Sequence, residues 1–132
     1  MSTLYYSPAD YTPLGSDSVA EYEVTDPGVA YPTAAKVGDK GPVETVKLYS
    51  DSTKTTQIGS EATHYSIEAD TADSVIVTFV TVANYTAPSP SVQTETVKYR
   101  LDSMGTFTLL SDSLVTPIAN LTITPASQPT QK

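Results

Sequence analysis

The chain has 132 residues, which is enough for one domain with its own core and too few for two. It contains no cysteine, so disulfides, thiol catalysis and thiolate metal sites are excluded. Its formal net charge of −8 argues against nucleic acid and anionic membranes as partners, because both are bound through clustered lysine and arginine.

The composition favours an all-β fold. Threonine and valine are abundant, good helix formers are scarce, and no window repeats apolar residues with the period of a helix. No apolar run approaches the 18 or so residues that a membrane helix needs. The first twenty residues lack the basic start and apolar stretch of a signal peptide, so we expect synthesis in the cytoplasm.

Residues 1–42 differ from the rest of the chain, since they are acidic and hold half of the ten prolines. Proline at this density opposes helices and most sheet ladders, and only residues 19–25 alternate like a strand. We interpret this part as an extended arm with one short strand. Tyrosine is favoured at interfaces, so the arm is predicted to dock on neighbouring subunits; packing of the tyrosines on the chain's own domain is the alternative. The candidate contact residues are Tyr5, Tyr6, Tyr11, Tyr22 and Tyr31.

Residues 43–126 are predicted to form a β-domain. Residues 43–50 alternate, with Val46 and Leu48 on one face, and residues 51–54 then form a turn. A weaker strand is expected over residues 55–58. A further strand covers residues 64–69, with Tyr65 and Ile67 directed inward, and residues 70–73 turn the chain again.

Residues 74–85 form the longest apolar run and are apolar on both faces, which is typical of a central strand. A proline-rich loop or crossover follows over residues 87–92. Residues 95–101 and 106–110 then predict a hairpin closed by Asp102 and Gly105. A last strand is expected over residues 118–124, before a polar tail at 127–132.

Six to eight short strands with regular turns predict a single antiparallel β-sandwich, immunoglobulin-like or jelly-roll-like, with the extended N-terminal arm attached. A closed up-and-down barrel is the alternative. The cysteine pair and tryptophan of antibody domains are absent from this chain.

No residue set resembles the machinery of an enzyme. His64 is the single histidine, and neither Thr63 nor Ser66 completes a catalytic triad with it. Nucleophile-elbow, phosphate-loop and dinucleotide motifs are missing. We therefore predict a non-enzymatic protein without a cofactor or a transition-metal site.

The sequence leaves two further kinds of site open. Calcium accepts carboxylate oxygens, and several aspartates are expected in turns, although aspartate is also an ordinary turn residue. These are Asp51, Asp70, Asp73, Asp102 and Asp112. An isopeptide bond between Lys47 and Asn120 is a second possibility, and the two glycosylation sequons, at Asn84 and Asn120, are interpreted as chance.

These features predict a structural subunit of a larger assembly, with other protein subunits as partners and homo-oligomers expected. A virion protein, such as a phage capsid-decorating or minor coat protein, is the favoured class by analogy of design. The alternative is an immunoglobulin-like binding module that recognises carbohydrate or a cell-surface protein and is extracellular or on a cell surface. A small barrel around an apolar ligand ranks last.

Overall fold

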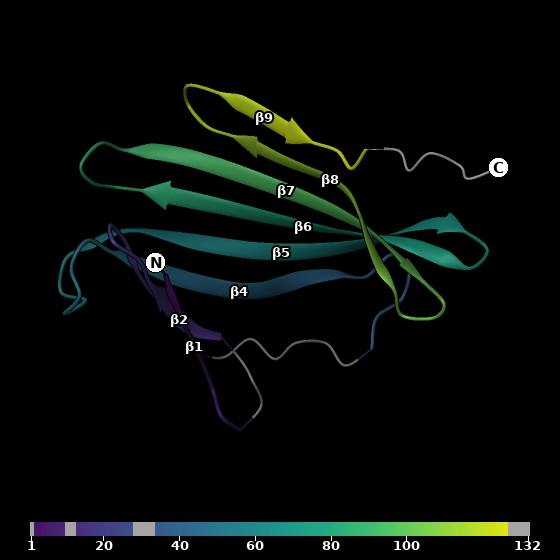
Figure 1. The fold of residues 1–132 in the computed structure, drawn as a ribbon, viewed down its shortest axis with the longest axis horizontal. Coiled ribbons are helices and arrows are strands. Elements are labelled where there is room, and N and C mark those ends of the chain that lie inside the picture. The colour runs from purple at the N-terminus through teal and green to yellow at the C-terminus, as the bar shows by residue number, and fades with distance from the viewer. Residues whose placement is uncertain (1, 10–12, 28–33, 127–132) are drawn as a thin grey trace.

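The computed structural model describes residues 2–9, 13–27 and 34–126, and these form one antiparallel sheet of nine strands. Each strand pairs with the next one along the chain, so the described residues form a continuous meander (Figure 1). The strands are β1 (Thr3–Tyr6), β2 (Pro13–Asp17), β3 (Tyr22–Thr25), β4 (Lys40–Tyr49), β5 (Gln57–Thr71), β6 (Ser74–Tyr85), β7 (Ser91–Asp102), β8 (Phe107–Val115) and β9 (Asn120–Ile123).

The all-β class and the antiparallel pairing are confirmed, but the two-sheet sandwich is not, because all nine strands belong to one sheet. The extended arm is not confirmed either. The described part of residues 1–42 contributes β1, β2 and β3 and the start of β4 to the sheet, in place of one short strand. Figure 1 shows these purple strands at one end of the sheet. Proline does not prevent this pairing, since Pro13 is the first residue of β2 and Pro42 lies at a register shift of β4.

The register divides the sheet into two faces, since directly opposed residues of antiparallel strands point to the same side. We call the face that carries Leu48 the inner face. Its pairings run from Leu48 through Gly59 to Tyr85, and from Ile67 through Val77 to Tyr99. The buried hydrophobic residues among those described all lie on it: Val46, Leu48, Ile67, Val77 and Ala83.

An aromatic row crosses the inner face at the end opposite the first three strands. Phe79 and Tyr99 pack edge to face with ring centroids 6.2 Å apart, and Tyr99 and Phe107 do the same at 5.7 Å. Such contacts add about 0.5–1.5 kcal/mol each beyond the area they bury. They join β6, β7 and β8 on one side of the sheet.

Gly59 lies where the inner face is most tightly covered. A Cβ atom at this position would stand 2.5 Å from the Asn84 carbonyl oxygen and 3.1 Å from the Tyr85 Cα atom. Only glycine permits this close approach of β5 and β6. Gly59 is paired with Leu48 of β4. Leu48 is the one described side chain that is both large and fully buried, at 0% exposure.

Several local predictions are confirmed. Strand β6 has the predicted bounds and lies between β5 and β7. The β7–β8 hairpin is closed by Asp102, whose carboxylate accepts hydrogen bonds from the backbone N–H groups of Met104 and Thr106, each at 2.9 Å. Gly105 has a φ of +84°, the left-handed conformation that the turn requires.

Other local predictions are wrong. The segments 55–58 and 64–69 are not separate strands, because β5 runs without a break from Gln57 to Thr71. Asp112 lies within β8 opposite Ile123 and not in a turn. Ile118 belongs to the tight turn before β9, where the Thr116 N–H donates to the Ala119 carbonyl. The predicted tail at 127–132 falls outside the described residues.

Replacement of Leu48 by alanine tests whether the curved sheet supplies the core. Leu48→Ala leaves a cavity that β4 and β5 cannot close, so we expect a loss of about 2–5 kcal/mol in the free energy of unfolding, measured by urea denaturation. Ile118→Ala is the matched control, because Ile118 is 96% exposed; its effect should stay within about 0.5 kcal/mol. Equal effects from the two variants would contradict this assignment of the core.

Candidate functional site

A cluster of carboxylates occupies the inner face beside Leu48. Glu61 on β5 lies directly between Val46 of β4 and Ala83 of β6, which are both buried. By register, Glu23 of β3 and Glu95 of β7 point to the same side. We call the set Glu21, Glu23, Glu44, Glu61 and Glu95 the carboxylate cluster.

Glu61 and Glu95 line a hollow of 160 Å³ together with Thr81, Ala83, Gln93 and Leu114. The hollow combines two carboxylates with hydroxyl and amide groups. One member of the cluster is held in place, since the Ser16 hydroxyl donates a 2.6 Å hydrogen bond to Oε2 of Glu23. That bond ties β2 to β3 on the inner face.

The cluster raises the pKa of Glu61 to about 7. Burial between two apolar neighbours is the largest cause, and repulsion from Glu23, Glu21, Glu44 and Glu95 adds to it. Burial is also the first cause of the raised pKa of Glu44, with repulsion from Glu23 second. The Glu61 carboxyl group therefore gains or loses its proton near neutral pH.

Tyr85, the last residue of β6, lies beside the carboxylate cluster. Burial, followed by the charges of Glu21 and Glu61, raises the pKa of its phenol to about 12. The pKa of Glu21 is raised by burial, and hydrogen bonding to the Tyr85 hydroxyl partly opposes this. The charge of Glu21 acts on Tyr85, so the turn before β3 lies near the Tyr85 end of β6. The cluster can bind and release a proton near neutral pH.

Sequence analysis did not select these residues, which are scattered from position 21 to position 95. A signal was available for Glu61, because it is in phase with Tyr65 and Ile67, the two residues predicted to point inward. A carboxylate in an inward position is unusual and often functional.

Tyr5, a predicted contact residue, is engaged within the chain. Its hydroxyl donates a 2.9 Å hydrogen bond to Asp17, and the Lys54 ammonium lies 5.6 Å from its ring centroid. Lys54 also pairs with Asp17 at 3.2 Å. These contacts fasten the β1–β2 hairpin to the turn between β4 and β5, and the hydrogen bond to Asp17 raises the pKa of Tyr5.

The other predicted tyrosines are not gathered into one site. Tyr6 is half exposed on the same edge strand as Tyr5, whereas Tyr22 is half-buried on β3 opposite Tyr49 and Asp17. Tyr11 and Tyr31 lie outside the described residues. The described tyrosines thus include both packed and exposed side chains.

The side chain of Asp51, one of the turn aspartates, accepts hydrogen bonds from within its own turn. Asp51 accepts hydrogen bonds from the backbone N–H of Thr56 at 2.7 Å and of Thr55 at 3.1 Å, as well as from the Thr53 hydroxyl. These donors lower the pKa of Asp51. They also fix the turn in which Lys54, with a φ of +56°, reaches Asp17.

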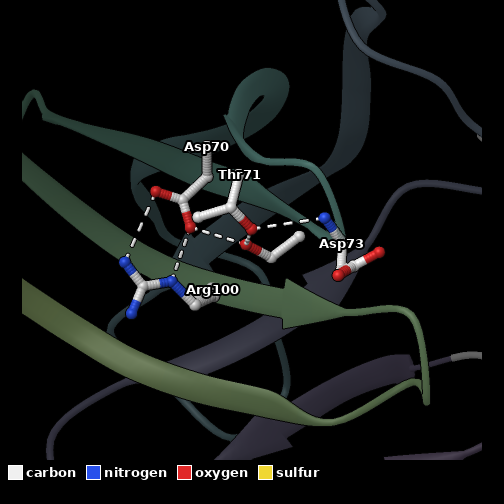
Figure 2. A network of polar contacts seen from close by, with 5 residues as sticks. Asp70, Thr71, Asp73 and Arg100 are labelled. Atoms are coloured by element: carbon white, nitrogen blue, oxygen red, sulfur yellow. Dashed lines mark hydrogen bonds and ion pairs between the residues drawn. The ribbon is translucent and has the colours of Figure 1, made fainter.

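Asp70 is held in a similar way at the end of β5 (Figure 2). It accepts hydrogen bonds from Arg100 Nε at 2.6 Å and from the Ser74 hydroxyl at 2.7 Å. The Arg100 hydrogen bond is the main reason that the pKa of Asp70 is lowered. Thr71 joins the network through Ser74 and accepts from the Asp73 N–H. No group of three acidic, histidine or cysteine side chains in residues 2–9, 13–27 and 34–126 could hold a metal ion.

The remaining candidates are separate from the cluster. His64 is exposed on the outer face, beside a shallow apolar hollow that includes Tyr65 and Val80. The isopeptide hypothesis is wrong, because Lys47 on β4 pairs with Asp26 at 2.7 Å, and four strands separate it from Asn120 on β9.

Comparison with known proteins found no matching family model, no similar curated protein and no similar solved structure. Within the described part of the chain, no helix has the length and apolar character needed to cross a membrane.

The carboxylate cluster predicts an unusual dependence of stability on pH. The pKa of Glu61 is about 7 when folded and 4.5 for the unperturbed group, so the folded chain binds more protons between these values. Stability should therefore fall as pH rises through this window. Glu61 is partly exposed, and after discounting for solvent screening we expect a loss on the order of 1 kcal/mol.

Glu61→Gln should remove most of this decrease in the free energy of unfolding with rising pH. The variant should also be more stable than the natural chain at pH 8, as measured by urea denaturation at several pH values. Glu68→Gln, a change to an exposed carboxylate on the same strand, is the control and should keep the slope. Equal slopes in the natural chain and Glu61→Gln would contradict the assigned proton site.

Proposed function

We propose that this protein is a non-enzymatic structural subunit of a larger protein assembly. The observation that carries the proposal is that the sheet ends in apolar, uncovered strands. At one end Leu4 is exposed, and at the other Phe107, Leu121 and Ile123 are exposed on the inner face. Large apolar side chains left exposed on edge strands are candidate contact residues for a partner subunit.

The small size of the core supports the same conclusion. Only five hydrophobic residues are buried among those described, and in this part of the chain the single sheet has no second layer to cover its other apolar side chains. Stable domains normally bury the apolar side of a sheet against another layer. The second layer of the predicted sandwich would then come from neighbouring subunits, as would the surfaces on which Tyr6 and the rest of the predicted arm dock.

A virion is the assembly we favour, with the chain as a capsid-decorating or minor coat protein. Such a role requires many copies at high local concentration, and the net charge of −8 keeps separate copies soluble through mutual repulsion. It also requires surfaces that bind protein, which the exposed apolar residues provide.

A module that binds carbohydrate or a cell-surface protein is the second candidate. Sugar binding would use exposed aromatic rings, and Tyr6 and Phe107 are exposed. They lie on β1 and β8, toward opposite edges of the sheet, so they do not form one stacking platform. Tyr5 is engaged with Asp17 and Lys54. The structural role therefore has the stronger support.

The native mass of the purified chain tests the proposed function. Light scattering over a range of protein concentrations should give a mass above the 14.0 kDa of one chain and a mass that rises with concentration, because association follows mass action. A constant mass of 14.0 kDa, together with reproducible binding on a glycan array, would contradict the subunit role and favour the binding module.

A further inference from the structure

The C-terminal edge of the sheet has an open row of backbone hydrogen-bonding groups. Among the described strands, β9 pairs only with β8, and its four residues are all exposed. Natural sheets usually protect such an edge with charge, proline or a bulge. Residues 120–123 contain no charged residue or proline, and the β8–β9 register has no shift.

The direction of these backbone groups follows from the turn before β9. The Thr116 N–H donates to the Ala119 carbonyl at 2.8 Å, which makes this pair a hydrogen-bonded one. Hydrogen-bonded and non-hydrogen-bonded pairs alternate along an antiparallel ladder. Leu121 and Ile123 therefore bond to β8, whereas the N–H and C=O groups of Asn120 and Thr122 point away from it.

The other edge of the sheet is less suited to pairing. Strand β1 has a register shift between Tyr5 and Tyr6, and such a bulge interrupts the regular row of donors and acceptors. A neutral strand is the best partner for β9, because residues 120–123 are themselves uncharged and offer no counter-charge to a charged strand. A second copy of β9 meets this requirement and is self-complementary.

We propose that two copies of this chain pair through their β9 strands in antiparallel fashion, which joins two sheets across a twofold axis. The inference rests on the proposed function and identifies one contact of the assembly. Asn120 of each copy lies opposite Thr122 of the other, so that every outward N–H meets an outward C=O. The two Leu121 side chains then face each other on the inner face, where each is 55% exposed in the single chain.

Cysteine cross-linking tests this register. The chain has no cysteine, so a single introduced thiol can form a disulfide only between copies. In the proposed pairing the two 121 positions form a non-hydrogen-bonded pair, in which Cβ atoms lie close to the separation a disulfide requires. Leu121→Cys should give a covalent dimer of twice 14.0 kDa under mild oxidation. Met104→Cys, at a 90% exposed turn position, is the control and should remain mostly uncross-linked.

Thr122→Pro supplies the second arm of the test. It removes an outward N–H that β8 does not use, so the hairpin remains while the pairing is lost. When combined with Leu121→Cys it should abolish the covalent dimer, and alone it should lower the native mass. A monomeric natural chain would overturn both this inference and the proposed function. A larger natural mass that Thr122→Pro leaves unchanged, without cross-linking through Leu121→Cys, would overturn the β9 pairing alone.

Discussion

A single sheet can bury its own apolar face only by curving, and this constraint governs the structure. Leu48 is covered completely beside Gly59, where the backbone of β6 approaches β5 closely. Every strand pairs with its sequence neighbour, so the hydrogen-bond ladder needs no long crossover. The ladder specifies which strands pair but provides no second layer. Burial is therefore deepest near the middle of the sheet, and the side chains of β1 and β9 remain exposed.

The same curvature creates the electrostatic conflict on the inner face. Glu23 on β3 and Glu21 in the turn before it both act on Glu61, which lies between buried neighbours. Apolar burial stabilises this arrangement, while the gathered negative charge opposes it above the pKa of Glu61. The two terms act on the same strands, and protonation of Glu61 lowers the repulsion between the carboxylates.

Local features could be predicted from the sequence because short-range chemistry determines them. The apolar run of β6 and the aspartate and glycine of the β7–β8 turn are such features. The number of layers could not be predicted, since alternation assigns residues to faces without showing what covers each face. Ile76 and Val80 suggested a strand covered on both sides, yet they are only half-buried on the outer face. Strands β1 and β2 were hidden by Pro13 and Gly15, which weaken any strand pattern. The carboxylate cluster was missed because its members meet only through the register of five strands and the turn before β3.

The difference between the two edges of the sheet limits how many copies an assembly could add by strand pairing. A sheet with two equivalent open edges would add copies without limit, because heterologous pairing generates filaments unless it closes. Here the edges differ, since β9 is regular and neutral whereas β1 is bulged and lies beside the Asp17–Lys54 ion pair. On the proposed pairing, β9 is used once in a twofold contact and leaves β1 outermost in both copies. Further growth by backbone pairing would then have to use the bulged β1 edge, so contacts between side chains on the faces are favoured over continued addition of strands.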